Sequence, residues 1–129
     1  MMTSELMSLT WVVALTAVMW VPYILNTIMV RGLFSAVGYP EDPAPLAGWA
    51  QKMKAAHYNA VENLVIFAAL VLIANAANIS NDMTVLACEL YFWARLVHFL
   101  AYGFAIPWVR TLAFAGGWVC QMLLLLQLI

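Results

Sequence analysis

The chain has 129 residues, of which 67% are hydrophobic and only 9% charged, and its mean hydropathy is +0.94. Soluble proteins carry about 25% charged residues, so this composition excludes a soluble globule and indicates an integral membrane protein. The net charge of −1 and the lack of a basic tract argue against a nucleic-acid partner. Long unbroken apolar runs exclude a β-barrel, whose strands alternate in polarity.

Four apolar stretches are each long enough to cross a bilayer, which takes about 20 residues of helix. We predict an all-α membrane protein with one domain, a bundle of four transmembrane helices over residues 9–30, 51–74, 83–106 and 108–129. The first stretch lacks the basic start and the cleavage site of a secretory signal, so it is expected to be retained. Pro22 should bend it. The prolines within residues 32–50 exclude a continuous helix across that connection.

Basic residues gather on the two connections that face one side of the membrane. They are Arg31, Lys52, Lys54 and Arg110. The opposite side carries Glu5 and Asp82 and no Lys or Arg. Because cytoplasmic loops are enriched in basic residues, we predict that both termini lie outside the cytosol.

Polar side chains interrupt the second and third stretches. At ~1.5 Å of rise per residue, Asn59 and His98 each lie about 12 Å from the same membrane surface. By the same measure of ~1.5 Å per residue, Glu62 and Arg95 each lie about 16 Å from it. A charge at this depth costs at least ~2.5–3.5 kcal/mol. We therefore predict a Glu62–Arg95 ion pair, with Asn59 and His98 beside it.

Polar residues between membrane helices often serve only as links between the helices. That interpretation remains open for Asn59, Glu62 and Arg95. For Tyr102, which lies near the end of a span, the alternative role is an anchor at the membrane surface.

Two cysteines, Cys88 and Cys120, lie within predicted spans, where we expect them to behave as small apolar side chains. Together with His57 and His98 they match no metal-ligand spacing, so no metal site is predicted.

The cationic side of the membrane favours an anionic, water-soluble ligand, and an apolar second substrate would arrive from the bilayer. This combination suggests conjugation or reduction chemistry at the lipid boundary. A hydroxyl donor such as Tyr102 or Thr111 would stabilise a thiolate there.

Two polar patterns on different helices, N-x-x-E at residues 59–62 and R-x-x-H-x-x-x-Y at residues 95–102, resemble a family signature. They are similar to that of the MAPEG family, the membrane-associated proteins in eicosanoid and glutathione metabolism. The P-E-D segment at residues 40–42 is similar to one in the prostaglandin E synthase branch. With the chain length and the four spans, the resemblance covers essentially the whole chain.

The resemblance implies a homotrimer that binds glutathione between neighbouring subunits near the cytoplasmic face. The glutathione-binding residues that it implies are Arg31, Asn59, Glu62, Arg95, His98 and Tyr102. Many members carry Arg where this chain has Ala55, so either one anchoring charge is missing or Lys54 replaces it.

The resemblance also implies catalytic positions. Tyr102 or Arg110 would stabilise the thiolate. Arg110 and Thr111 resemble an Arg-Ser pair near the thiol, and Asp42 resembles an acid proposed to assist catalysis in the synthase branch.

The leading hypothesis is a glutathione-dependent transferase or peroxidase that acts on lipophilic electrophiles at the cytoplasmic face of a bacterial inner membrane, in contact with membrane lipids. The alternative is a non-catalytic membrane module, a lipid-binding or assembly protein that retains the fold. A small transporter is disfavoured because one four-helix chain offers no repeat with broken helices.

Overall fold

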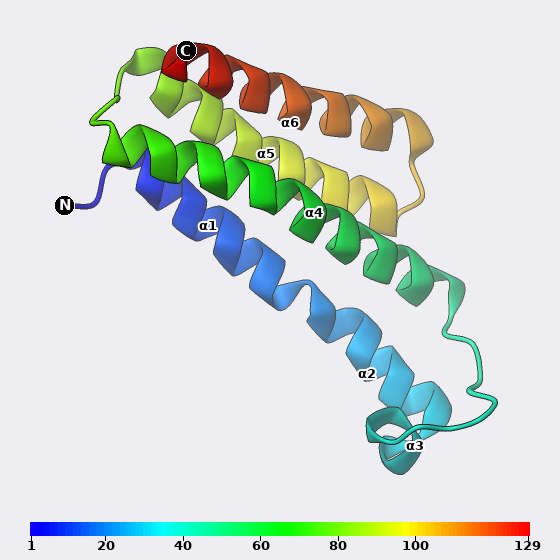
Figure 1. Ribbon diagram of the computed structural model, residues 1–129. Coiled ribbons are helices and arrows are strands. Elements are labelled where there is room, and N and C mark those ends of the chain that lie inside the picture. Colours follow the sequence, from blue (N-terminus) through cyan, green and yellow to red (C-terminus); the bar gives the residue numbers. More distant parts are fainter.

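A computed structural model describes residues 1–129 as a bundle of helices without strands (Figure 1). The helices are α1 (Ser4–Val18), α2 (Trp20–Arg31), α3 (Leu33–Val37), α4 (Gly48–Ala76), α5 (Asp82–Gly103) and α6 (Pro107–Leu128). Four helical segments are long and apolar enough to cross a membrane: Ser4–Arg31, Gly48–Ala76, Asp82–Gly103 and Pro107–Leu128. The predicted all-α membrane fold with four spanning helices is confirmed.

The first spanning segment is interrupted at Met19, which separates α1 from α2. Pro22 has no N–H group, so the carbonyl of Val18 loses its normal partner one turn ahead. The N–H of Met19 donates instead to the carbonyl of Thr16 at 3.3 Å, as in a tighter helical turn. The bend expected from Pro22 therefore appears as a break three residues before it.

Local signals explain where the helices begin and end. Asn81 caps α5, because its side chain accepts from the N–H groups of Met83 and Thr84. The same helix ends at Gly103, earlier than the predicted residue 106, and Pro107 begins α6. Proline is well suited to that first position because its N–H would have no partner there.

A short helix, α3, lies in the connection across which the prolines exclude a continuous helix. It follows Gly32, whose φ of 79° is accessible mainly to glycine. The connection then runs back to α4, which begins at Gly48 rather than at residue 51.

The termini and the turn between α4 and α5 lie at one end of the bundle, which we call the terminal end (Figure 1). The connection with α3 and the turn between α5 and α6 lie at the other, which we call the basic end. The hairpin of α5 and α6 is the most extensive helix pair, and α1 and α4 pack against α5. In contrast, α2 contacts only α1, α3 and α4.

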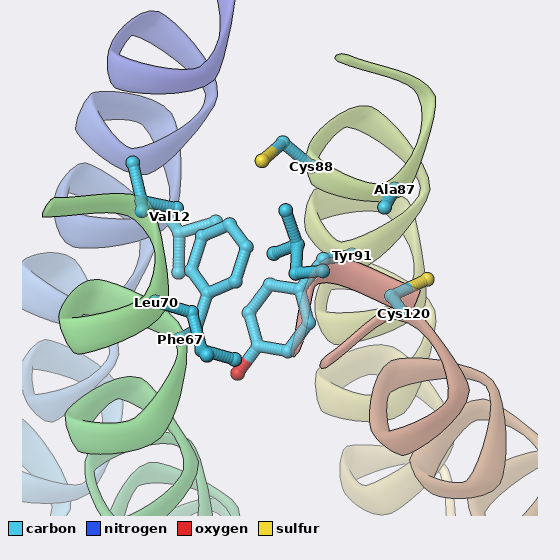
Figure 2. Close-up of a cluster of buried hydrophobic side chains, with 9 residues drawn as sticks. Val12, Phe67, Leu70, Ala87, Cys88, Tyr91 and Cys120 are labelled. Carbon is cyan, nitrogen blue, oxygen red and sulfur yellow. The ribbon is translucent and has the colours of Figure 1, made fainter. Parts of the chain in front are cut away.

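The interior contains a large core toward the terminal end and a small one toward the basic end. The large core consists of Val12, Phe67, Leu70, Val71, Ala87, Cys88, Tyr91, Cys120 and Leu124 (Figure 2). At its centre the rings of Phe67 and Tyr91 stack with their centroids 3.9 Å apart. The small core consists of Met19, Ala56 and Ala60. Both cysteines are buried and free, as their apolar setting predicts.

Large apolar side chains cover the outside of the bundle. Trp11, Trp93 and Trp118, on three different helices, are each more than half exposed. Such a surface suits contact with lipid or with another protein, because exposing large apolar side chains to water is unfavourable.

Candidate functional site

The site is built around Arg95, which α5 places in the interior with only 4% of its surface exposed. Its Nη2 donates to Oδ1 of Asn59 on α4 at 2.7 Å. The same nitrogen lies 3.4 Å from Nδ1 of His98, one turn along α5. Arginine can only donate, so this contact requires Nδ1 of His98 as the acceptor and places the ring proton on Nε2. Asn59 and His98 thus lie beside Arg95, as predicted.

The predicted ion pair between Glu62 and Arg95 is wrong for the single chain. The side chain of Glu62 is exposed and takes part in no hydrogen bond or salt bridge within the chain. At 3.6 residues per turn, a spacing of three residues leaves Glu62 rotated by about 60° from Asn59 around the axis of α4. Asn59 faces α5 and bonds to Arg95, whereas Glu62 lies on the neighbouring part of the helix surface, where it is exposed.

The polar cluster opens onto a depression of about 290 Å³ between α4, α5 and α6. It is lined by Asn59, His98, Tyr102, Arg110, Thr111 and Phe114. The guanidinium of Arg110 lies 5.0 Å from the centre of the Tyr102 ring, a cation–π distance. The rings of His98 and Tyr102 meet edge to face at 5.6 Å. One side of the depression thus presents a phenol, a guanidinium and an imidazole together.

Five residues of the predicted set do not line this depression. One is Arg95, which is buried beside it, and the other four are Arg31, Asp42, Lys54 and Glu62. Nε of Arg31 donates to the carbonyl oxygen of Ala44 at 2.7 Å, which ties the end of α2 to the following connection. Nζ of Lys54 lies 5.7 Å from the centre of the Tyr58 ring. Asp42 is exposed in the connection.

The sequence did not indicate a second polar link, which holds α2 against α4. Oη of Tyr23 lies 2.7 Å from Nδ1 of His57. One turn further along α2, Oδ1 of Asn26 accepts from the backbone N–H of Ala47 at 3.0 Å. Tyr23 and Asn26 are both buried. Two polar side chains three residues apart in an otherwise apolar helix share a face, and this was the sequence signal that could have indicated the link.

Another unpredicted contact joins α6 to α4 in the interior. Nε2 of Gln121 donates to the carbonyl of Asn63 at 3.1 Å. Nδ2 of Asn63 in turn donates to the carbonyl of Asn59 at 2.9 Å. These contacts fix α4 and α6 next to the position from which Asn59 reaches Arg95.

The cluster carries a positive charge that the chain does not neutralise. No carboxylate pairs with Arg95, and its Nε is buried without a hydrogen-bond partner. Because an unpaired buried charge is costly, a site of this kind favours an anion, and Arg110 adds a second cation at its opening. No group of three or more His, Cys, Asp or Glu side chains is placed to hold a metal ion. The geometry therefore suits an anionic ligand with several hydrogen-bond acceptors.

The sequence matches a family model described as the MAPEG family over residues 8–129, nearly the whole chain. That range includes every residue that lines the depression. No curated protein and no solved structure gives a significant match.

Proposed function

The chain belongs to the MAPEG family, and from that premise we propose that it is a glutathione-dependent transferase or peroxidase acting on lipophilic electrophiles. Members of this family generally use glutathione. The observation that carries the proposal is the buried, unneutralised Arg95 beside a depression that contains Tyr102 and Arg110.

The donor set fits glutathione, which is an anion with two carboxylates and two amide carbonyls. Arg95 and Arg110 would bind carboxylates, because a guanidinium offers paired N–H donors to a planar acceptor. Asn59, His98 and Tyr102 would add neutral hydrogen bonds around them. Bound glutathione would supply a thiol as the nucleophile.

Two side chains of the depression are placed to favour the thiolate. The hydroxyl of Tyr102 or the guanidinium of Arg110 would donate to the developing negative charge, and the hydroxyl of Thr111 is a further donor. Arg110 lies over the Tyr102 ring, so each side chain restricts the position of the other. This restriction reduces the reorganisation that stabilising the charge would require.

A homotrimer would account for the four predicted residues that the single chain leaves apart. Glu62 is exposed on a spanning helix, and a charge facing lipid costs at least ~2.5–3.5 kcal/mol. Contact with a neighbouring subunit removes that cost. We propose that Arg31, Asp42, Lys54 and Glu62 act across such contacts, with glutathione between subunits. Lys54 would then supply the charge that Ala55 lacks.

The charge distribution supports an orientation. We propose that the basic end faces the cytosol of a bacterial inner membrane, because Arg31, Lys52, Lys54 and Arg110 lie there. Both termini would then lie outside the cytosol. In this orientation glutathione enters the depression from the cytosol, and the electrophile arrives from the bilayer past exposed apolar side chains such as Phe114.

The test is titration calorimetry of the detergent-purified protein with glutathione, followed by an assay with a chlorodinitrobenzene as electrophile. We expect saturable heat at millimolar glutathione or below. Removing the hydroxyl that stabilises the thiolate, in Tyr102→Phe, should lower the conjugation rate by about 10-fold or more. Tyr58→Phe removes a hydroxyl from an exposed position on α4 and should leave the rate unchanged.

Absence of heat at millimolar glutathione would reject the proposal. Full activity in both Tyr102→Phe and Arg110→Ala would exclude the roles given to these two side chains. A phospholipid that co-purifies in the depression and is not displaced by glutathione would favour the non-catalytic membrane module.

A further inference from the structure

A buried carboxylate lies at the terminal end, on the opposite side of the membrane from the proposed active site. Glu5, in the first turn of α1, is only 3% exposed. Its Oε1 accepts from Oγ of Ser80 at 2.8 Å and from Oγ1 of Thr84 at 2.6 Å. Its Oε2 is buried and has no hydrogen-bond partner. One oxygen of this carboxylate thus has hydrogen-bond donors, and the other has none.

The surroundings stabilise the ionised form of Glu5. Glu5 lies in the first turn of α1, and Thr84 lies in the first turn of α5, so the positive ends of two helices face the carboxylate. Two hydroxyl donors on a single oxygen also suit a carboxylate, which can only accept. No cationic side chain lies at this end of the chain, and neither a side chain nor the amino group of the exposed Met1 forms a salt bridge with Glu5. A cation bound in the neighbouring space would therefore neutralise the charge.

The carboxylate borders a depression of about 150 Å³ in which polar side chains predominate. Its lining consists of Thr3, Glu5, Ala74, Asn75, Asn78, Ile79 and Ser80. The depression lies where α4 ends, and the carbonyls of Ile73, Ala74 and Asn75 there already accept from the N–H groups of the following turn, which leaves the side chains as the acceptors. The terminal torsion of a glutamate is soft, so a small rotation would turn Oε2 toward a donor in this space.

We propose that this depression binds a primary ammonium group, either the ethanolamine headgroup of a phospholipid or a small free amine. An ammonium has three N–H donors, which match Oε2 of Glu5 and the side-chain oxygens of Asn75 and Asn78. A divalent cation fits less well, because only one carboxylate is present. The position at the ends of three spanning helices corresponds to the headgroup level of a bilayer.

The test compares two lipids of equal charge that differ in their N–H groups. Detergent-purified protein is titrated with dioleoyl phosphatidylethanolamine or dioleoyl phosphatidylcholine, and bound lipid is counted by native mass spectrometry. The choline headgroup is quaternary and cannot donate a hydrogen bond. We expect the ethanolamine lipid to bind about 10-fold more tightly, as for one hydrogen bond to a charged group.

Substitutions assign this preference to Glu5. Glu5→Gln should bring the two lipids to nearly equal affinity, whereas Glu89→Gln, which removes an exposed acid of α5, should preserve the preference. If Glu5→Gln does not fold, Asn78→Gly serves instead. It removes one proposed acceptor at a residue whose φ is 56°, a value that glycine adopts freely. A weaker preference is expected in that variant.

A competition experiment distinguishes the two sources of the amine. Free ethanolamine that competes with the lipid would assign the site to the ammonium group itself, whereas binding of the lipid alone would assign it to a membrane headgroup. Equal affinity for both lipids in the wild type, with no binding of ethanolamine, would overturn the proposal. So would a preference that survives in Glu5→Gln, and Glu5 would then only join α1 to α5.

Discussion

The terminal and basic ends of the bundle hold their helices together by different means. Toward the terminal end, side chains from α1, α4, α5 and α6 meet in one continuous core with a stacked aromatic pair at its centre (Figure 2). Toward the basic end, the core shrinks to Met19, Ala56 and Ala60, and α2 has no contact with α5 or α6. Polar contacts such as Tyr23–His57 and Asn59–Arg95 take over there.

This difference separates the part of the bundle that fixes the fold from the part that holds the proposed glutathione site. Close packing in lipid comes from van der Waals contact, so the large core gives the helices a fixed arrangement. Polar contacts contribute less, about 0.6 kcal/mol on average between membrane helices. Substitutions in the large core should therefore affect stability, and substitutions in the polar cluster at the basic end should affect glutathione binding.

The largest effect on stability is expected from Phe67→Ala in the large core. Phe67 is fully buried and stacks on Tyr91, so the substitution leaves a cavity between α4 and α5. At about 24 cal/mol per Å³, a cavity of roughly 100 Å³ costs about 2 kcal/mol in free energy of unfolding. Unfolding by denaturant in detergent measures the loss.

Val65→Ala is the matched control for this prediction. Val65 lies on the same helix but is 68% exposed, so its truncation leaves no cavity and should cost little. Equal losses in the two variants would show that the stacked pair contributes no special stability.

Arg95→Leu should give the opposite result, with lost ligand binding and little loss of stability. The guanidinium is buried without a carboxylate partner, and an apolar replacement of an unneutralised charge is often neutral or stabilising. Glutathione affinity should fall by at least about 10-fold, the loss expected for one charge-assisted hydrogen bond. Calorimetry measures the affinity, and the melting temperature without ligand measures the stability.

Arg95→Lys provides the comparison, because it keeps the charge but not the paired donors. Arg95→Lys should bind glutathione more tightly than Arg95→Leu. It should also melt at a lower temperature than Arg95→Leu, since burying an ammonium costs at least as much free energy as burying a guanidinium. A trimer that dissociates in Arg95→Leu without ligand would instead identify Arg95 as a structural link.

The sequence predicted the spans and the depths of the polar residues, because both depend on local properties. Hydropathy identifies a spanning helix, and a rise of ~1.5 Å per residue sets Arg95 level with α4 residues near Asn59. Rotation about the helix axis was not predictable in this way. Asn59 and Glu62 lie on neighbouring parts of one face, and only the packing of α4 against α5 determines that Asn59 makes the contact.

The cluster around Glu5 was beyond prediction for a different reason. Its partners Ser80 and Thr84 are 75 and 79 residues away in sequence, and nothing local connects them. Prediction from the sequence has a third limit, which concerns the expected site residues that lie outside the depression, such as Arg31 and Glu62. If they act between subunits, as proposed, neither the sequence nor a single chain contains their relative positions.

The smallest effect is expected at the link between α2 and α4. Tyr23→Phe removes the hydroxyl that lies 2.7 Å from Nδ1 of His57, a loss of about 1 kcal/mol for one buried hydrogen bond. The helix α2 has few other contacts with the bundle, so this loss should appear as local opening rather than global unfolding. Amide hydrogen exchange in α2 should accelerate about 5-fold, the equivalent of ~1 kcal/mol.

Exchange in α5 and α6 should not change in this variant, because those helices are held by the large core and do not contact α2. Tyr39→Phe, at a fully exposed position in the connection before α4, should leave all segments as they are. Acceleration spread evenly over every helix would mean that α2 opens only when the whole bundle does. The two ends would then form one cooperative unit, and the basic end could not open for a ligand independently of the core.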